Sequence, residues 1–178
     1  MVRRLVVRLA SITVAAAAGL TPVTGGDAAV VNCVGIGVIG SIQYGTCNTD
    51  EHGGSGSVRF AHNPLTATLI AAGGSAAEQV AGFWESNGPV DVAGGEICVT
   101  VRVTNFTAKG GATSEQRLDL SYDFTPHPQV FPTTKGTSRL CGAVPTGAKN
   151  VFWQLLTTVE ATGGGSRARL KETLVGVS

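Results

Sequence analysis

The sequence is poor in charged and aromatic side chains. Of its 178 residues, 14% are charged and 6% are aromatic, and 13 basic against 12 acidic residues give a net charge of +1 at pH 7. A near-neutral chain lacks the basic excess typical of nucleic-acid-binding proteins, and no polybasic cluster is present to hold it on anionic lipid. A sugar-stacking platform needs several rings on one face, and the sequence does not show such a set. Composition therefore predicts neither a nucleic-acid partner nor a lipid-surface partner.

Recognised catalytic motifs are also missing. The chain contains neither G-x-S-x-G nor H-E-x-x-H. His52 and His62 have no shared acidic neighbour, and His127 lies between two prolines. We predict no catalytic residue, no metal and no cofactor. A secreted hydrolase with an unrecognised site stays open as an alternative, because a site assembled in three dimensions leaves no linear motif.

One apparent motif is a coincidence. Gly35–Gly40 reads GIGVIG and matches the dinucleotide-binding pattern G-x-G-x-x-G. That pattern works only where the glycines open a helix and an acidic residue follows about 20 residues later. Here Ser41–Cys47 is rich in β-branched residues and glycine, and the later segment Ser57–Phe60 has no acid. In a chain with 25 glycines we reject the motif.

The N-terminus resembles an export signal. A basic start, Met1–Arg8, precedes the uncharged, mostly apolar run Leu9–Leu20, and small residues follow. This run is shorter than the roughly 20 residues of a spanning helix. We expect residues 1–28 to be a signal peptide, cut after Ala28 or Ala29, with the choice between Sec and twin-arginine export left open. Residues 29–178 are then one secreted domain without a membrane span, in the style of bacterial extracellular proteins.

The expected mature chain is also close to neutral. Removing Arg3, Arg4 and Arg8 leaves ten basic residues, and removing Asp27 leaves eleven acidic ones, so the net charge becomes −1.

The four cysteines of the expected mature chain, Cys33, Cys47, Cys98 and Cys141, indicate two disulfides in an oxidising compartment. No pair has the CxxC spacing of a metal site. Sequential pairing closes the shortest loops, so we predict Cys33–Cys47 and Cys98–Cys141, contributing about 3 and about 4 kcal/mol in the chain-entropy model.

Alternation of apolar and polar residues dominates the rest of the chain. It predicts strands over Glu96–Asn105 and Ser114–Thr125, joined at Lys109–Gly111 as an antiparallel hairpin. Asn150–Ala161 and Arg167–Val177 predict a second hairpin. Shorter strand candidates are Val30–Val38, Ile42–Thr46, Ser57–His62, Thr66–Ala71 and Pro89–Val92.

A short helix is expected only at Ser75–Glu78, where a Ser with Glu three residues later can form a capping box. The fold class is therefore all-β: an antiparallel β-sandwich, immunoglobulin-like or jelly-roll-like, with about seven to nine strands stapled by two disulfides.

Three surface features are candidates for binding. The polar loop 48–56 offers oxygen ligands but lacks calcium-site spacing, so we read it as a solvated tip. The Pro-rich stretch 125–136 is expected to be a stiff loop carrying Val130 and Phe131, either capping the core or contacting a partner. Trp84 lies in weakly patterned sequence and is the tryptophan expected to be exposed.

The last predicted strand carries Arg167, Arg169 and Lys171 on one face. These cations fit an anionic cell-envelope polymer, or an edge strand protected by charge against edge-to-edge pairing. The favoured function is a non-catalytic binding or cell-surface-associated module whose partner is a protein or an envelope polymer. The alternatives are a proteinaceous inhibitor presenting the loop 125–136 and the hydrolase above.

Overall fold

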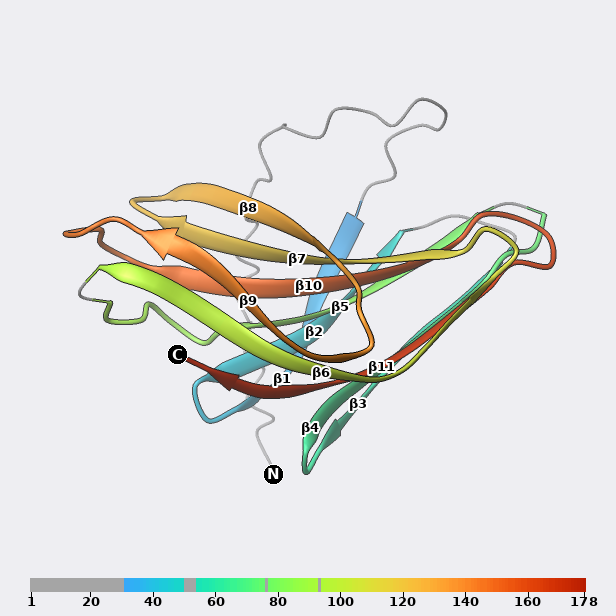
Figure 1. Ribbon diagram of the computed structural model, residues 1–178, viewed down its shortest axis with the longest axis horizontal. Helices are drawn as coiled ribbons and strands as arrows, with labels where there is room; N and C mark the ends of the chain where they lie inside the picture. The colour runs from blue at the N-terminus through green and yellow to red at the C-terminus, as the bar shows by residue number, and fades with distance from the viewer. Residues whose placement is uncertain (1–30, 50–53, 76, 93) are drawn as a thin grey trace, which may run out of the picture.

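The computed structural model describes residues 31–49, 54–75, 77–92 and 94–178 (Figure 1). The expected signal peptide and the tip of the polar loop, residues 50–53, lie outside the described residues. Within the described residues the chain forms eleven strands and no helix. They are β1 (Val31–Ile39), β2 (Ile42–Thr49), β3 (Ser55–His62), β4 (Leu65–Ala72), β5 (Glu78–Ser86), β6 (Gly95–Lys109), β7 (Thr113–Tyr122), β8 (Thr125–Pro132), β9 (Gly136–Val144), β10 (Phe152–Ala161) and β11 (Arg167–Val177).

The strands build two antiparallel sheets that enclose the core between them (Figure 1). Sheet A has the order β1-β2-β5-β10-β7-β8, and sheet B has the order β3-β4-β11-β6-β9. The predicted class, an antiparallel β-sandwich with two disulfides, is confirmed. Both predicted pairings are also confirmed: Cys33–Cys47 joins β1 to β2, and Cys98–Cys141 joins β6 to β9. No helix of the described chain is long and apolar enough to cross a membrane.

Both predicted hairpins are wrong. β6 and β7 lie in different sheets, and so do β10 and β11. The connecting turns, with left-handed glycines such as Gly110 and Gly165, carry the chain across the sandwich. A Cβ on Gly110 would lie 3.0 Å from the Ser166 Cα atom, so these two turns pack side by side (Figure 1). Alternation could not separate the two cases, because a strand in either sheet buries one face in the same core.

The helix predicted to start at Ser75–Glu78 is not formed, and strand β5 begins at Glu78 instead. β5 is a central strand of sheet A and is buried on both faces, so its sequence lacks the alternation of a half-exposed strand. Trp84 points into the core, where it is 1% exposed and packs edge-on against Phe60 at 6.3 Å between ring centroids. The expectation that Trp84 is exposed is therefore wrong. The predicted strand at Pro89–Val92 is reduced to one bridge between Val90 and Val151.

Most of the predicted Pro-rich loop is strand β8, at one edge of sheet A. β8 pairs with β7 along its whole length, and its three prolines, at positions 126, 128 and 132, all lie on the same side of the alternation. A proline is accommodated in an edge strand where its missing N–H would face away from the sheet. Phe131 faces inward and packs half-buried against the core, whereas Val130 faces outward and is 60% exposed.

The turn between β7 and β8 holds the most exposed large hydrophobic side chain in the described part of the protein. Phe124 is 86% exposed and has φ of 63°, and Asp123 before it has φ of 51°. The Asp123 N–H donates to the Lys149 carbonyl oxygen at 2.9 Å, and the Lys149 N–H donates to Asp123 Oδ1 at 3.1 Å. The tip is therefore anchored to the loop before β10 although Phe124 occupies a conformation that favours glycine.

A buried polar group interrupts the apolar core. Glu172 of β11 is fully buried, and Gln116 Nε2 of β7 donates to its Oε2 atom at 2.8 Å across the two sheets. Thr157 of β10 lies directly opposite Gln116 and is also fully buried. Burial raises the pKa of Glu172 to about 7, against the smaller opposing effect of hydrogen bonding. The core therefore contains one carboxyl group that favours its neutral form.

Glu172 should make the stability of the fold depend on pH. Its folded pKa of about 7 exceeds the ordinary value of 4.5, so the native state retains this proton where the unfolded chain has lost it. We expect the free energy of unfolding to fall as the pH rises from about 4.5 to about 7, and Glu172→Gln to remove this slope. Urea denaturation between about pH 4 and pH 8 measures it. An identical slope in both proteins would contradict a neutral, buried Glu172.

The hairpin tip yields a second prediction. Phe124→Gly should raise the free energy of unfolding by about 0.5–1 kcal/mol, because relief of a left-handed penalty of about 1–2 kcal/mol exceeds the entropic cost of glycine. Phe131→Ala should lower it by roughly 2 kcal/mol, about half the cost of a fully buried Phe. Thermal and urea denaturation of both variants measures the contrast. Destabilisation by Phe124→Gly would disprove the strained, exposed tip.

Candidate binding face

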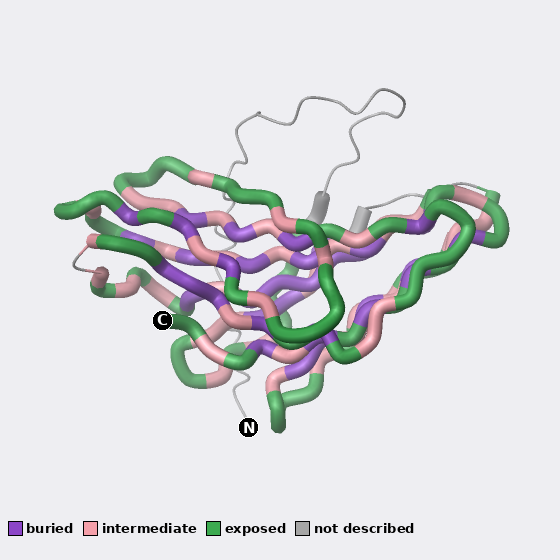
Figure 2. The backbone as a smooth tube through the Cα atoms, in the orientation of Figure 1, coloured by how far each residue is buried: buried purple, intermediate pink, exposed green. Residues whose placement is uncertain are grey.

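The outer face of sheet B is set by strand β11. Ala168, Leu170, Glu172 and Leu174 point into the core, and the residues that alternate with them point away from it, as the alternating burial along the strands in Figure 2 illustrates. This alternation places the side chains of Arg167, Arg169 and Lys171 on the outer face, where all three are exposed.

The strand register adds further cations to this face. Arg167 lies opposite Lys109 of β6, and Lys171 lies opposite Thr68 of β4, which in turn lies opposite Arg59 of β3. Residues directly opposite each other share a face. Sequence reasoning missed Arg59 and Lys109, since their proximity to β11 depends on strand order.

Seven exposed cations therefore occupy one face: Arg59, Arg102, Lys109, Arg139, Arg167, Arg169 and Lys171. Residues 31–178 contain ten Lys and Arg in total, so most of the basic side chains lie here. Among described residues, Glu96 is the only acid on this face, and it pairs with Arg139 at 3.1 Å. Arg102 donates to the Thr137 hydroxyl at 3.4 Å, and the other five cations have no ion pair with a described acid.

The outer face of sheet A has the opposite character. It carries Glu85, Glu115, Asp119 and Glu160, against one cation, Arg117, which is bound to Asp119 at 2.7 Å. Burial raises the pKa of Glu85, and a hydrogen bond from Gln154 at 2.8 Å partly offsets that effect. The net charge near zero thus hides a separation of charge between two faces.

The location of β11 also corrects an expectation. The edge-strand explanation for Arg167, Arg169 and Lys171 requires an open sheet edge, but β11 lies at the centre of sheet B between β4 and β6. A central strand has both neighbours in place and needs no charge to discourage pairing. These three cations therefore require another explanation.

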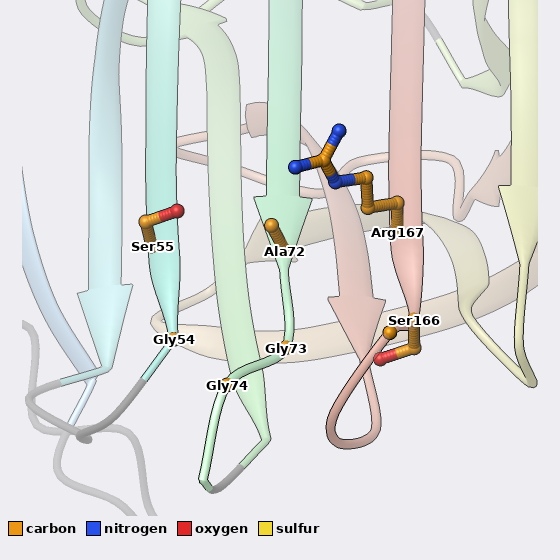
Figure 3. A pocket seen from close by; sticks show the side chains of 8 residues that line it. Gly54, Ser55, Ala72, Gly73, Gly74, Ser166 and Arg167 are labelled. Carbon is orange, nitrogen blue, oxygen red and sulfur yellow. The ribbon is translucent and has the colours of Figure 1, made fainter.

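The basic face ends at a shallow hollow of about 400 Å³ (Figure 3). The hollow is lined by Gly54, Ser55, Ala72, Gly73, Gly74, Gly165, Ser166 and Arg167. Arg167 extends from β11 towards β4, beside Ala72 (Figure 3). The Gly73 N–H donates to the Ser166 carbonyl oxygen at 3.0 Å, which ties the turns beyond β4 and before β11 together.

The described residues bring no metal site together on this face. Glu96, Cys98 and Cys141 have their ligand atoms close to one another, but both sulfur atoms belong to a disulfide and offer no thiolate. The polar loop 48–56, considered for calcium, includes residues outside the described part of the chain, so its binding stays an open prediction.

The predicted partner-contact residues do not form one surface. Val130 lies on the outer face of β8, Phe131 on its inner face, and Trp84 in the core. The exposed aromatic side chain nearby is Phe124, which sequence reasoning placed at the end of a strand. The turn that exposes Phe124 is formed by Asp123 and Phe124, two non-glycine residues with positive φ, so the sequence lacks the glycine that usually marks such a turn.

No family model and no curated protein matches the sequence. Among solved structures, the chain is similar to that of TmCBM61 in complex with beta-1,4-galactotriose. The similarity has 10% sequence identity and a TM-score of 0.38, and it covers 68% of this chain and 85% of that one. A likeness at this level carries no argument about the ligand of this protein, so the basic face has to be interpreted from its own residues.

Proposed function

We propose that the protein is a secreted, non-catalytic binding module that attaches to a polyanionic polymer through the outer face of sheet B. The observation that carries the proposal is the concentration of seven exposed cations, with one paired acid, on a face of a near-neutral chain. Secretion is supported by the expected signal peptide, and the two disulfides are compatible with an extracellular location.

The chemistry of the face suits a polymer. An exposed ion pair contributes only about 0–1 kcal/mol, so a single anion gains little from any one of these cations. A polymer that contacts several of them adds those contributions within one binding event and releases counterions from both surfaces. Hydroxyl groups of Thr68, Thr107 and Thr173 lie in the same cross-strand rows and offer hydrogen bonds to the polymer.

The face does not support catalysis. A hydrolase needs an acid or a base free to move a proton, and the one described acid on this face is bound to Arg139. The inhibitor hypothesis loses its main support, because most of the segment meant to act as a free loop is a paired strand. We therefore retain the binding module as the function.

Charge reversal tests the face against the rest of the molecule. We expect the double variant Arg167→Glu with Arg169→Glu to lose binding to immobilised polygalacturonate at low salt, since it replaces attraction by repulsion within the face. The matched control, Lys135→Glu with Lys149→Glu, reverses two exposed loop cations and changes the net charge by the same amount. It should elute at nearly the salt concentration of the wild type.

Circular dichroism and thermal melting verify that both variants fold. Equal losses in the two double variants would show that net charge, and not this face, governs binding. A wild-type protein that passes through anionic resin at low salt without retention would refute the proposed function.

A further inference from the structure

We propose that the polymer lies along β11 and that the face selects a linear chain with one negative charge about every 7 Å. This inference rests on the proposed function and specifies how the same face chooses its ligand.

The longest uninterrupted line of cations runs along one strand. Arg167, Arg169 and Lys171 occupy successive outer positions of β11, and alternate residues of a strand are spaced by about 7 Å. Across the strands, neighbours are only about 5 Å apart, but the rows contain fewer adjacent cations. The row of Arg167 has one cation neighbour, Lys109, and the row of Arg169 has Ile70 and Thr107 beside it. A linear polyanion therefore meets most charges when it follows β11.

Cations on both sides of β11 define a track. Lys109 of β6 lies beside the start of the line, and Arg59 of β3 lies two strands away from its end, with Thr68 between. Two strand spacings separate Arg59 from Lys171 by about 10 Å, so Arg59 lies to one side of a polymer that follows β11. One cation therefore flanks the line on each side, Lys109 at its start and Arg59 at its end.

The line has a defined length. After Lys171 the remainder of β11 offers no exposed charged side chain: Thr173 faces outward, and a bulge between Leu174 and Gly176 then shifts the alternation, so that Val177 lies opposite the buried Val99. At the other end the strand begins at Arg167, next to the turn that borders the hollow. The central line therefore holds three cations, and a ligand needs about three regularly spaced charges to fill it.

This geometry identifies a ligand class by its charge spacing. An extended, unbranched chain fits if its anions recur about every 7 Å. A single multivalent anion cannot contact all three cations, which span about 14 Å from Arg167 to Lys171.

Oligomers of defined length test the inference. Glycerol-phosphate oligomers with one to eight charges, and oligogalacturonates with the same numbers, would be titrated into the full secreted protein by calorimetry at low salt. We expect affinity to rise steeply up to about three charges and only slowly beyond that number, as extra charges add statistical binding positions. A threshold at about three charges in the glycerol-phosphate series supports the proposal. The oligogalacturonates, whose carboxylates recur at the shorter spacing of one sugar residue, should bind more weakly, and equal affinity of the two series would overturn selection by spacing.

Two single variants test the direction of the chain. Arg169→Ala removes the centre of the line and should weaken binding of the four-charge oligomer about tenfold and reduce the salt slope by about one unit. Arg102→Ala removes an exposed arginine of the same face that lies off the line and should weaken binding less than threefold. Both arginines are exposed, so neither change should affect folding.

The outcomes separate the inference from the proposed function. Equal losses for Arg169→Ala and Arg102→Ala, or an affinity that rises evenly with length through eight charges, would overturn the alignment along β11 while leaving the basic face as the binding surface. Absence of binding to every oligomer and to the polymer would overturn both.

Discussion

The structure depends on the burial of one side of β11 against sheet A. β11 is the central strand of sheet B, and the inward side chains of Ala168, Leu170 and Leu174 lie in the core that both sheets share. Because side chains alternate, this burial fixes which residues face water, and the register with β4 and β6 then aligns the cations of three other strands with those of β11. The core thus positions the basic face. Glu172 is the exception on the inner side, and its raised pKa shows the cost of placing a carboxyl group there.

Much of the fold was accessible from the sequence, for a definite reason. Half-buried strands such as β6, β7, β10 and β11 carry a regular alternation, and two disulfides follow from four cysteines in a chain that is expected to be exported. What alternation does not encode is which sheet a strand joins. The turns after β6 and β10 look like hairpin turns but cross the sandwich. The sequence of β5 lacks alternation because both of its faces are buried, and a short helix was predicted at its start. β8 was predicted to be a loop because it contains three prolines, which an edge strand can accommodate.

The candidate site was only partly predictable. Arg167, Arg169 and Lys171 stand out by their spacing within one strand, whereas Arg59, Arg102, Lys109 and Arg139 join them through strand order. Net charge was misleading, because it sums over a basic face on sheet B and an acidic face on sheet A. Trp84 and Phe131 attracted attention as apolar residues in weakly patterned sequence, yet both contact the core. The most exposed aromatic residue, Phe124, sits at a turn that lacks the usual glycine.

We propose that one face of the sandwich binds a polyanion and that the other face does not. The most direct measurement is the change in backbone amide NMR signals of the isotope-labelled protein as a glycerol-phosphate oligomer is added. We expect the perturbed amides to cluster on β11 and on the parts of β3, β4 and β6 beside it, while those of β5, β7 and β10 stay unchanged. Perturbations centred on the outer face of sheet A, or spread evenly over both faces, would contradict this proposal.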